Sequence, residues 1–309
     1  DCEEFSMGYN RPEAKALAKQ AMRTTYPHPM LVTLVYLLLT SVLTSLVSSL
    51  VTDPFTTFYY YVWDGVYGVE DLIRVLLTPR NVASFLVIQL LITVYQWIMS
   101  FGYTSYVLRM ARNEQPNYWN LLDGFHTIGR AFLVYLLIYI FTTLWSLLFL
   151  VPAFIVMLVS ALGGPMLMFL ALLLVIAAAI LSVIVTYRYR LAVYFLLDNP
   201  EMGALAAITE SKRAMMGWKG ELFIQDLSFL GWWLLLSLAS LLAFSLGSIF
   251  GLGVGGLLSF LTVKIASLWF NPYIWGTEAN FYDWVVHGRY SYRDNSGPDA
   301  GYQSPYSNF

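Results

Sequence analysis

Long apolar stretches alternate with short polar segments along almost the whole chain. Six of these stretches exceed the roughly 18 residues that mark a membrane-spanning helix. We expect the spans at about 30–51, 82–103, 131–162, 166–187, 222–250 and 257–282, with a glycine-rich loop at 251–256. The pattern therefore predicts an all-α fold, a polytopic membrane protein with about six transmembrane helices.

Two of the polar segments have the pattern of amphipathic helices. Arg11, Lys15, Lys19 and Arg23 recur at a spacing of four, which places them on one side of a helix. We expect this helix to be short and to lie at the interface of an anionic leaflet. Residues 201–216 predict a second amphipathic helix on the cytoplasmic side.

The positive charges are distributed unevenly between the two sides of the predicted bundle. Fourteen of the seventeen Lys and Arg residues lie in the N-terminal segment, between spans two and three, between spans four and five, or in the tail. Cytoplasmic segments carry such an excess, so we expect both termini in the cytoplasm. The predicted parts are a cytoplasmic segment with an interfacial helix at 1–28, a six-helix transmembrane domain at 29–286 and a disordered cytoplasmic tail at 287–309.

Composition agrees with a membrane protein and narrows the possible partners. Apolar residues make up 58% of the chain and charged residues 12%, whereas a soluble domain carries roughly 25% charged residues. A net charge of −2 gives no reason to expect nucleic acid as a partner. Cys2 is the sole cysteine, which excludes an intramolecular disulfide and a cysteine-based metal cage. We predict no metal and no cofactor. The first 28 residues contain no apolar stretch, so we also expect no cleaved signal peptide of the usual form.

The sequence shows no recognisable catalytic constellation. The three histidines, His28, His126 and His287, fall outside the predicted spans and far apart along the chain. No His-x-x-x-His pair, Gly-x-Ser-x-Gly elbow or phosphate-binding loop occurs. We therefore expect a protein that is not an enzyme.

Five charged residues lie at a similar depth near the cytoplasmic ends of different spans. They are Asp226, Glu278, Arg130, Arg188 and Arg190. Pairing among them would neutralise charge at the cytoplasmic rim of the bundle, which is the favoured interpretation. The alternative is that they line an inner vestibule.

Lys264 is the one cation inside a predicted span. A cation at this depth costs at least a few kcal/mol unless it reaches the interface or is paired. Gln89 lies at the same depth and Gln96 two turns further in, so the three residues form a candidate intramembrane polar site. Snorkelling, or pairing with Asp64, Glu70 or Asp71 of the aromatic outer loop, is the structural alternative. Asn271-Pro272 predicts an interruption of the same span.

Several motifs resemble one bacterial family of integral membrane proteins, the domain-of-unknown-function 975 family. The most specific are residues 144–149 (LWSLLF) with Pro152, residues 189–194 (YRLAVY) leading to residues 198–200 (DNP), and residues 210–220 (ESKRAMMGWKG) continuing through 222–223 (LF) to 227–232 (LSFLGW). Residues 124–125, 272–273 and 281–282 are also similar to the family. Ala153 departs from the glycine that the family usually has after this proline, and 158–184 adds apolar length, which bears on how spans three and four pack. The resemblance implies a multi-pass bacterial protein and brings no assigned activity.

The basic motif just before span five has two interpretations. Lys212, Arg213 and Lys219 could contact lipid headgroups or an acidic partner. The favoured alternative is structural: an amphipathic helix that stops at Gly217 or Gly220, with its cations placed by the positive-inside rule.

Taken together, the sequence predicts a non-enzymatic protein of the bacterial cytoplasmic (inner) membrane that organises lipids or partner proteins. Its expected partners are membrane lipids, and a protein partner or a second copy of the chain is possible. The alternative function is a small-molecule or ion transporter or channel with a polar site around Lys264 and Gln89.

Overall fold

The computed structural model describes residues 9–51, 53–64, 77–160, 165–288 and 290, and these residues form helices and connecting segments without a strand. Six helices of this described part are long and apolar enough to cross a membrane. They are Pro29–Ser49, Pro79–Ala111, Ile128–Ser160, Met166–Asp198, Lys219–Ser248 and Gly253–His287. The predicted all-α polytopic fold is confirmed. Residues 291–309 of the predicted tail, and Glu70 and Asp71 of the outer loop, lie outside the described residues.

The predicted N-terminal helix is present as α1 (Arg11–Thr24). Its buried face includes Ala14, Ala18 and Ala21, each fully buried. These small side chains let α1 pack directly on α14 (Leu252–His287). A Cβ added at Gly276 of α14 would lie 3.4 Å from the Cβ of Ala18. The apolar face of α1 therefore packs against protein.

The first two spans meet through aromatic and hydroxyl side chains. The first span contains a single π-helical segment between two α-helices. Tyr36 stacks on Tyr103 with ring centroids 4.3 Å apart, and the hydroxyls of Thr33 and Tyr103 are 2.8 Å apart. The elements are α2 (Pro29–Leu37), the π-helix η1 (Leu38–Val42), α3 (Leu43–Ser49), α4 (Pro54–Asp64) and α6 (Pro79–Ala111).

The segment after α6 folds back onto α6 at two glycines. It contains the 3-10 helix η2 (Tyr118–Leu122) and the short helix α7 (Asp123–His126). A Cβ at Gly102 would lie 2.0 Å from the Leu121 carbonyl oxygen, and one at Gly124 would lie 2.1 Å from the Ile98 carbonyl oxygen. Glycine is therefore required at both positions for this close approach.

The third and fourth spans form an antiparallel pair, and the fourth span continues beyond a break. α9 ends at Thr186, a 3-10 turn follows, and a short helix ends at Asp198, immediately before Asn199 and Pro200. The predicted amphipathic helix at 201–216 is present as α11. The elements are α8 (Ile128–Ser160), α9 (Pro165–Thr186), the 3-10 helix η3 (Tyr187–Tyr189), α10 (Ala192–Asp198) and α11 (Ala204–Ala214).

The last two spans differ from the prediction in three places. The fifth span breaks at Ser228 into α12 (Lys219–Leu227) and α13 (Leu230–Ser248). From Leu252 onward the glycine-rich stretch is the start of α14 rather than a loop, and Gly251, with a φ of +127°, caps this helix. A Cβ at Gly247 would lie 2.6 Å from the Gly255 Cα, so glycine at these positions lets α13 and α14 approach closely. The predicted interruption at Asn271-Pro272 is wrong, since α14 runs through the buried Pro272. Packing of neighbouring helices tolerates the one lost hydrogen bond.

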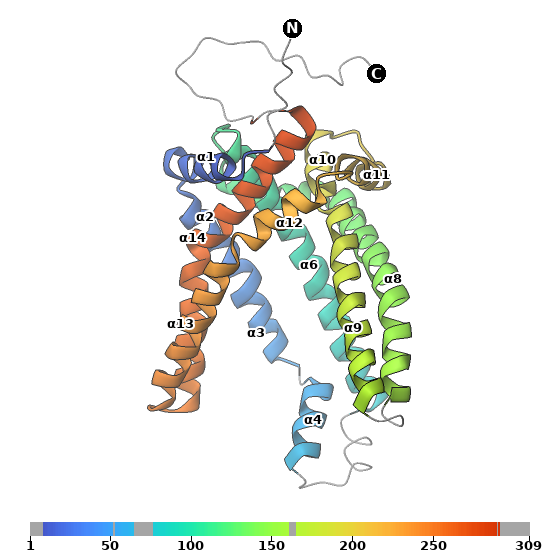
Figure 1. Cartoon of the computed structure of the whole chain (residues 1–309). Coiled ribbons are helices and arrows are strands. Elements are labelled where there is room, and N and C mark those ends of the chain that lie inside the picture. The colour runs from blue at the N-terminus through green and yellow to red at the C-terminus, as the bar shows by residue number, and fades with distance from the viewer. Residues whose placement is uncertain (1–8, 52, 65–76, 161–164, 289, 291–309) are drawn as a thin grey trace, which may run out of the picture.

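The helices converge at one end of the bundle. In Figure 1, α13 and α14 form one side, α8 and α9 the other, and α6 runs between them, while α1, α10 and α11 cover the top. We call this top the α1 end and the opposite, lower end the α4 end. The buried side chains gather mainly at the α1 end; the largest include Tyr103, Tyr106, Leu191, Met215, Phe281 and Tyr282.

Candidate functional site

Glu278 of α14 is the centre of one ion-pair cluster at the α1 end. Arg190 binds it with two hydrogen bonds, from Nε to Oε1 at 2.8 Å and from Nη2 to Oε2 at 2.9 Å. Asp226 of α12 completes the cluster, with its Oδ2 3.8 Å from Nη1 of Arg190 and accepting a 2.8 Å hydrogen bond from the Tyr187 hydroxyl. The cluster therefore joins the fourth, fifth and sixth spans.

The break after α9 is what points Arg190 at α14. The chain tightens into η3 and then turns, so that the Arg190 amide donates to the Tyr187 carbonyl. Ser211 of α11, fully buried, holds the turn from outside: its hydroxyl donates to the Arg188 carbonyl at 2.9 Å and accepts from the Leu191 amide at 3.2 Å. One side chain thus satisfies backbone groups that the break leaves without helical partners.

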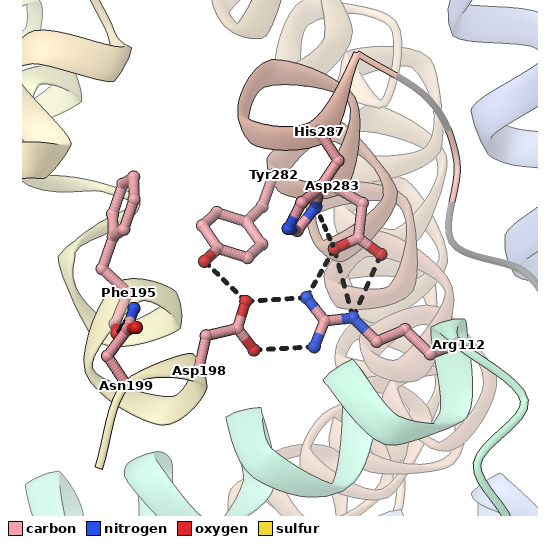
Figure 2. Close-up of polar contacts among 7 residues, drawn as sticks. All are labelled: Arg112, Phe195, Asp198, Asn199, Tyr282, Asp283 and His287. Carbon is pink, nitrogen blue, oxygen red and sulfur yellow. Dashed lines mark hydrogen bonds and ion pairs between the residues drawn. The ribbon is translucent and has the colours of Figure 1, made fainter. Parts of the chain in front are cut away.

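Arg112 is the centre of a second cluster, shown in Figure 2. Its Nη1 and Nη2 bind the two oxygens of Asp198 at 2.6 and 2.8 Å. Its Nη2 and Nε also reach Asp283 of α14, the shortest contact being 2.6 Å. The Tyr282 hydroxyl donates to Asp198 at 2.7 Å, and His287 Nδ1 lies 3.6 Å from Asp283. The cluster joins the ends of α6, α10 and α14.

The electrostatics of the second cluster favour the ionised form of Arg112. Burial by itself would lower the pKa of Arg112, but the hydrogen bonds that Arg112 donates to Asp198 and Asp283 reverse this and hold its pKa above the usual value. The Asp283 side chain is fully buried, and the Asp198 side chain is 20% exposed. The planar guanidinium presents five N–H donors in a fixed fork, so it can bind both carboxylates with several directed hydrogen bonds, whereas an ammonium has three donors and no fixed plane. Its geometry is that of a fixed structural clamp.

The predicted rim cluster is therefore only partly assembled. Asp226, Glu278 and Arg190 meet, as described above. Arg130 lies elsewhere and donates from Nη2 to the carbonyls of Leu196, Asn199 and Met202. Arg188 turns toward Trp145, with its guanidinium carbon 5.8 Å from the ring centroid.

The structure does not assemble the predicted intramembrane site of Lys264, Gln89 and Gln96. Lys264 Nζ donates to the Ser41 hydroxyl of η1 at 2.8 Å and lies 5.3 Å from the Phe260 ring centroid. Within the described part of the chain, neither glutamine shares a hydrogen bond with Lys264; Gln96 is exposed and Gln89 is half-buried. Lys264 thus pairs with η1 of the first span and not with the glutamines of α6.

The three cations of the basic motif have separate environments. Lys212 is exposed on α11, and Arg213 pairs with Glu210 one turn away at 3.0 Å. Lys219 begins α12. Gly217, between the two helices, has a φ of +86°, so the turn occurs at this glycine, while Gly220 is helical.

A groove lies between α1, α12 and α14, with a volume of about 520 Å³. Its lining residues are Arg11, Pro12, Lys15, Ala16, Lys19, Ile224, Ser228 and Tyr273. Arg11 is bound to Glu221 at 2.7 Å, whereas Lys15 donates to the Ser228 hydroxyl. Lys15 Nζ also lies 4.3 Å from the Phe229 ring centroid, and Lys19 Nζ 5.2 Å from that of Tyr273.

A second hollow of about 390 Å³ lies between α6, α7, α8 and α10. Arg109, Arg112 and Arg130 line it together with the carboxylates of Asp123, Glu114 and Asp198. The three arginines and the three carboxylates balance in charge, so the hollow offers no net charge that would attract a charged ligand. Among the described residues, no group of three or more His, Cys, Asp or Glu residues could hold a metal ion.

Sequence reasoning missed Arg112, Asp198 and Asp283. In the sequence, Asp198 stands out only as part of the 198–200 (DNP) motif, and the other two lie just beyond apolar spans. The usable signal is that opposite charges follow three different spans at the same end of the bundle, where an unpaired buried charge would be costly.

Comparison with known proteins supports one family. The family model described as "Protein of unknown function (DUF975)" matches residues 7–288. No curated protein and no solved structure matches the chain. The matched range contains every helix from α1 to α14 and both ion-pair clusters.

Proposed function

The chain belongs to the DUF975 family of proteins of unknown function, and from that premise we propose a non-enzymatic, multi-pass protein that organises lipids or partner proteins in the bacterial cytoplasmic membrane. The α1 end faces the cytoplasm in this proposal. The excess of Lys and Arg in the segments at that end supports the orientation.

The proposal rests on the pairing of the charged side chains at the α1 end. The buried charges pair with one another: Arg112 with Asp198 and Asp283, and Arg190 with Glu278. Such pairs fix the ends of the helices relative to one another, which supports a structural role for these charges. Lys15 and Lys19 of α1 have no carboxylate partner among the described residues and lie at the surface of the α1 end, where they can meet headgroups or an acidic partner.

The proposal predicts that the protein selects its surrounding lipids. Native membrane discs cut out with a styrene–maleic acid copolymer retain the lipids around a protein. We expect anionic phospholipids, measured by mass spectrometry, to be enriched in affinity-purified discs above their share of the whole membrane. The control is the average disc from the same extract. Identical lipid composition in the two samples, with no co-purifying protein partner, would argue against the proposal.

Transport is the second candidate function, favoured by one observation. Lys264 binds Ser41 in a π-helical segment, and such segments occur frequently at functional sites. Against it, Gln89 and Gln96 do not join Lys264, and α14 is unbroken at Pro272. Proteoliposomes that show a Lys264-dependent flux of an ion or small solute would favour transport over the organising role.

A further inference from the structure

We propose that the groove between α1 and α12 is a binding site for one anionic glycerophospholipid, with its phosphate held between Lys15 and Lys19. This inference rests on the proposed function and assigns its lipid contact to named residues. The argument uses the charge of the groove, its apolar continuation and its level relative to the interfacial aromatic residues.

The charge of the groove selects an anion. Its described lining contains three cations and no carboxylate. Arg11 is neutralised by Glu221, which leaves Lys15 and Lys19 without a carboxylate partner among the described residues. Residues one helical turn apart have Cβ atoms about 5–6 Å apart, so two ammonium groups at this spacing can bind different oxygens of one phosphate. The Ser228 hydroxyl supplies a further polar contact beside Lys15.

The surroundings of Lys15 fit the same conclusion. Burial lowers the pKa of Lys15, and the neighbouring positive charge of Lys19 lowers it further. Two cations held close together without a counter-ion repel each other. A bound phosphate would remove this repulsion, which gives the site a reason to prefer a charged headgroup over a zwitterionic one.

The apolar side of the groove selects a lipid over a soluble anion or an acidic peptide. Ile224 and the Tyr273 ring line the groove beneath the lysines. Directly after Phe229, α13 presents Trp232 and Trp233, which are 51% and 48% exposed. Tryptophan at this position marks the headgroup level of a membrane. Below it, α13 exposes a row of leucines on which acyl chains can lie: Leu234, Leu235, Leu238, Leu241 and Leu242.

The architecture keeps the lysines at that level. The alanine face of α1 lies against α14, and the Asn280 amide donates to the Ala14 carbonyl at 2.9 Å. Tyr9 donates to the buried Gln225 of α12. α1 is therefore fixed on both sides of the groove, so Lys15 and Lys19 are held in position before a lipid binds.

The test uses the full-length protein in detergent and compares three probes: dioleoylphosphatidylglycerol, dioleoylphosphatidylcholine and glycerol 3-phosphate. The readout is the probe concentration that gives half of the maximal rise in the thermal unfolding midpoint. Each cation near an anionic lipid surface contributes roughly a fivefold change in affinity. We therefore expect K15Q/K19Q to weaken the effect of phosphatidylglycerol by about 25-fold relative to the wild-type chain.

The matched control is R23Q/K212Q, which removes the same net charge from exposed positions outside the groove. It should stay within about twofold of the wild type, and K15R/K19R should retain most of the affinity, because both variants leave the positive charge of the groove unchanged. Equal losses in the two glutamine pairs would show a diffuse surface attraction and overturn the site. Equal stabilisation by glycerol 3-phosphate would also overturn it, as a soluble-anion site.

The result also separates this inference from the proposed function. If the wild-type chain prefers phosphatidylglycerol but K15Q/K19Q prefers it equally, the groove is wrong and the lipid-organising role stands. If the wild-type chain shows no preference for the anionic lipid, lipid organisation loses its support together with the groove.

Discussion

Replacing Arg112 by methionine tests whether the second cluster is a clamp that holds three helix ends together. The change removes one guanidinium and leaves Asp198 and Asp283 without their shared partner. Removing one partner of a buried pair typically costs about 3–5 kcal/mol, because the remaining charge stays buried and unpaired. Here the cost is concentrated on Asp283, whose side chain is fully buried, while the 20% exposed Asp198 keeps some water and the Tyr282 hydroxyl.

This asymmetry predicts an ordered set of double variants. R112M should lower the free energy of unfolding by about 3–5 kcal/mol. R112M/D283N should recover most of the loss, because the stranded charge is removed. R112M/D198N should recover less, because the solvent already screens Asp198. His287, with Nδ1 3.6 Å from Asp283, reduces the loss wherever it is protonated.

The free energy of unfolding can be measured by titrating the purified protein with sodium dodecyl sulfate in mixed micelles and following tryptophan fluorescence. R109M is the matched control, since Arg109 lies one turn earlier on α6, is exposed, and has no ion pair in the described part of the chain. Its effect should stay within about 0.5 kcal/mol. A neutral R112M, or equal recovery by the two asparagine changes, would refute the clamp.

Three further changes test close packing, the turn before α12 and the intramembrane cation. Gly102→Ala should destabilise by about 1–3 kcal/mol through overpacking against a backbone carbonyl, whereas Gly129→Ala, with open space around it, should be neutral or stabilising in the same unfolding titration. Gly217→Val should cost about 1–3 kcal/mol because its φ is positive, and equal folded yield with Gly220→Val in the adjacent helix would contradict this. Lys264→Met should leave the unfolding midpoint equal or higher, because its described partner is a hydroxyl and no carboxylate is stranded; a marked loss of stability would point to a charged partner.

Hydropathy and charge were sufficient to predict the spans and α1, because each of these helices is determined by residues close together in the sequence. Apolar length determines what can cross a membrane, and the four-residue spacing of Arg11, Lys15, Lys19 and Arg23 predicted the helix that the structure contains. The glycine stretch at 251–256 was assigned to a loop because glycine is common in loops. Glycine also permits close contact between helices, and that is its role here. Which of these applies depends on the partner helix, here through Gly247.

The ion-pair clusters show where sequence reasoning reaches its limit. The distance of a residue from the end of a span can be counted in the sequence, and this count placed Asp226, Glu278 and Arg190 in one predicted charge cluster. The direction of each side chain around its helix depends on breaks such as the η3 turn, which no periodicity indicates. The partners of Arg112 lie 86 and 171 residues away in the sequence, so only the packing of α6, α10 and α14 brings them together.

The central claim, that the α1 end is a fixed platform for anionic lipid, is tested most directly by an electron cryo-microscopy map of the full-length protein in nanodiscs containing phosphatidylglycerol and phosphatidylcholine. We predict headgroup density between Lys15 and Lys19, continuing as acyl density along the exposed leucines of α13, and its loss in K15Q/K19Q. An empty groove in the wild-type map, or the same density in the variant, would contradict the account.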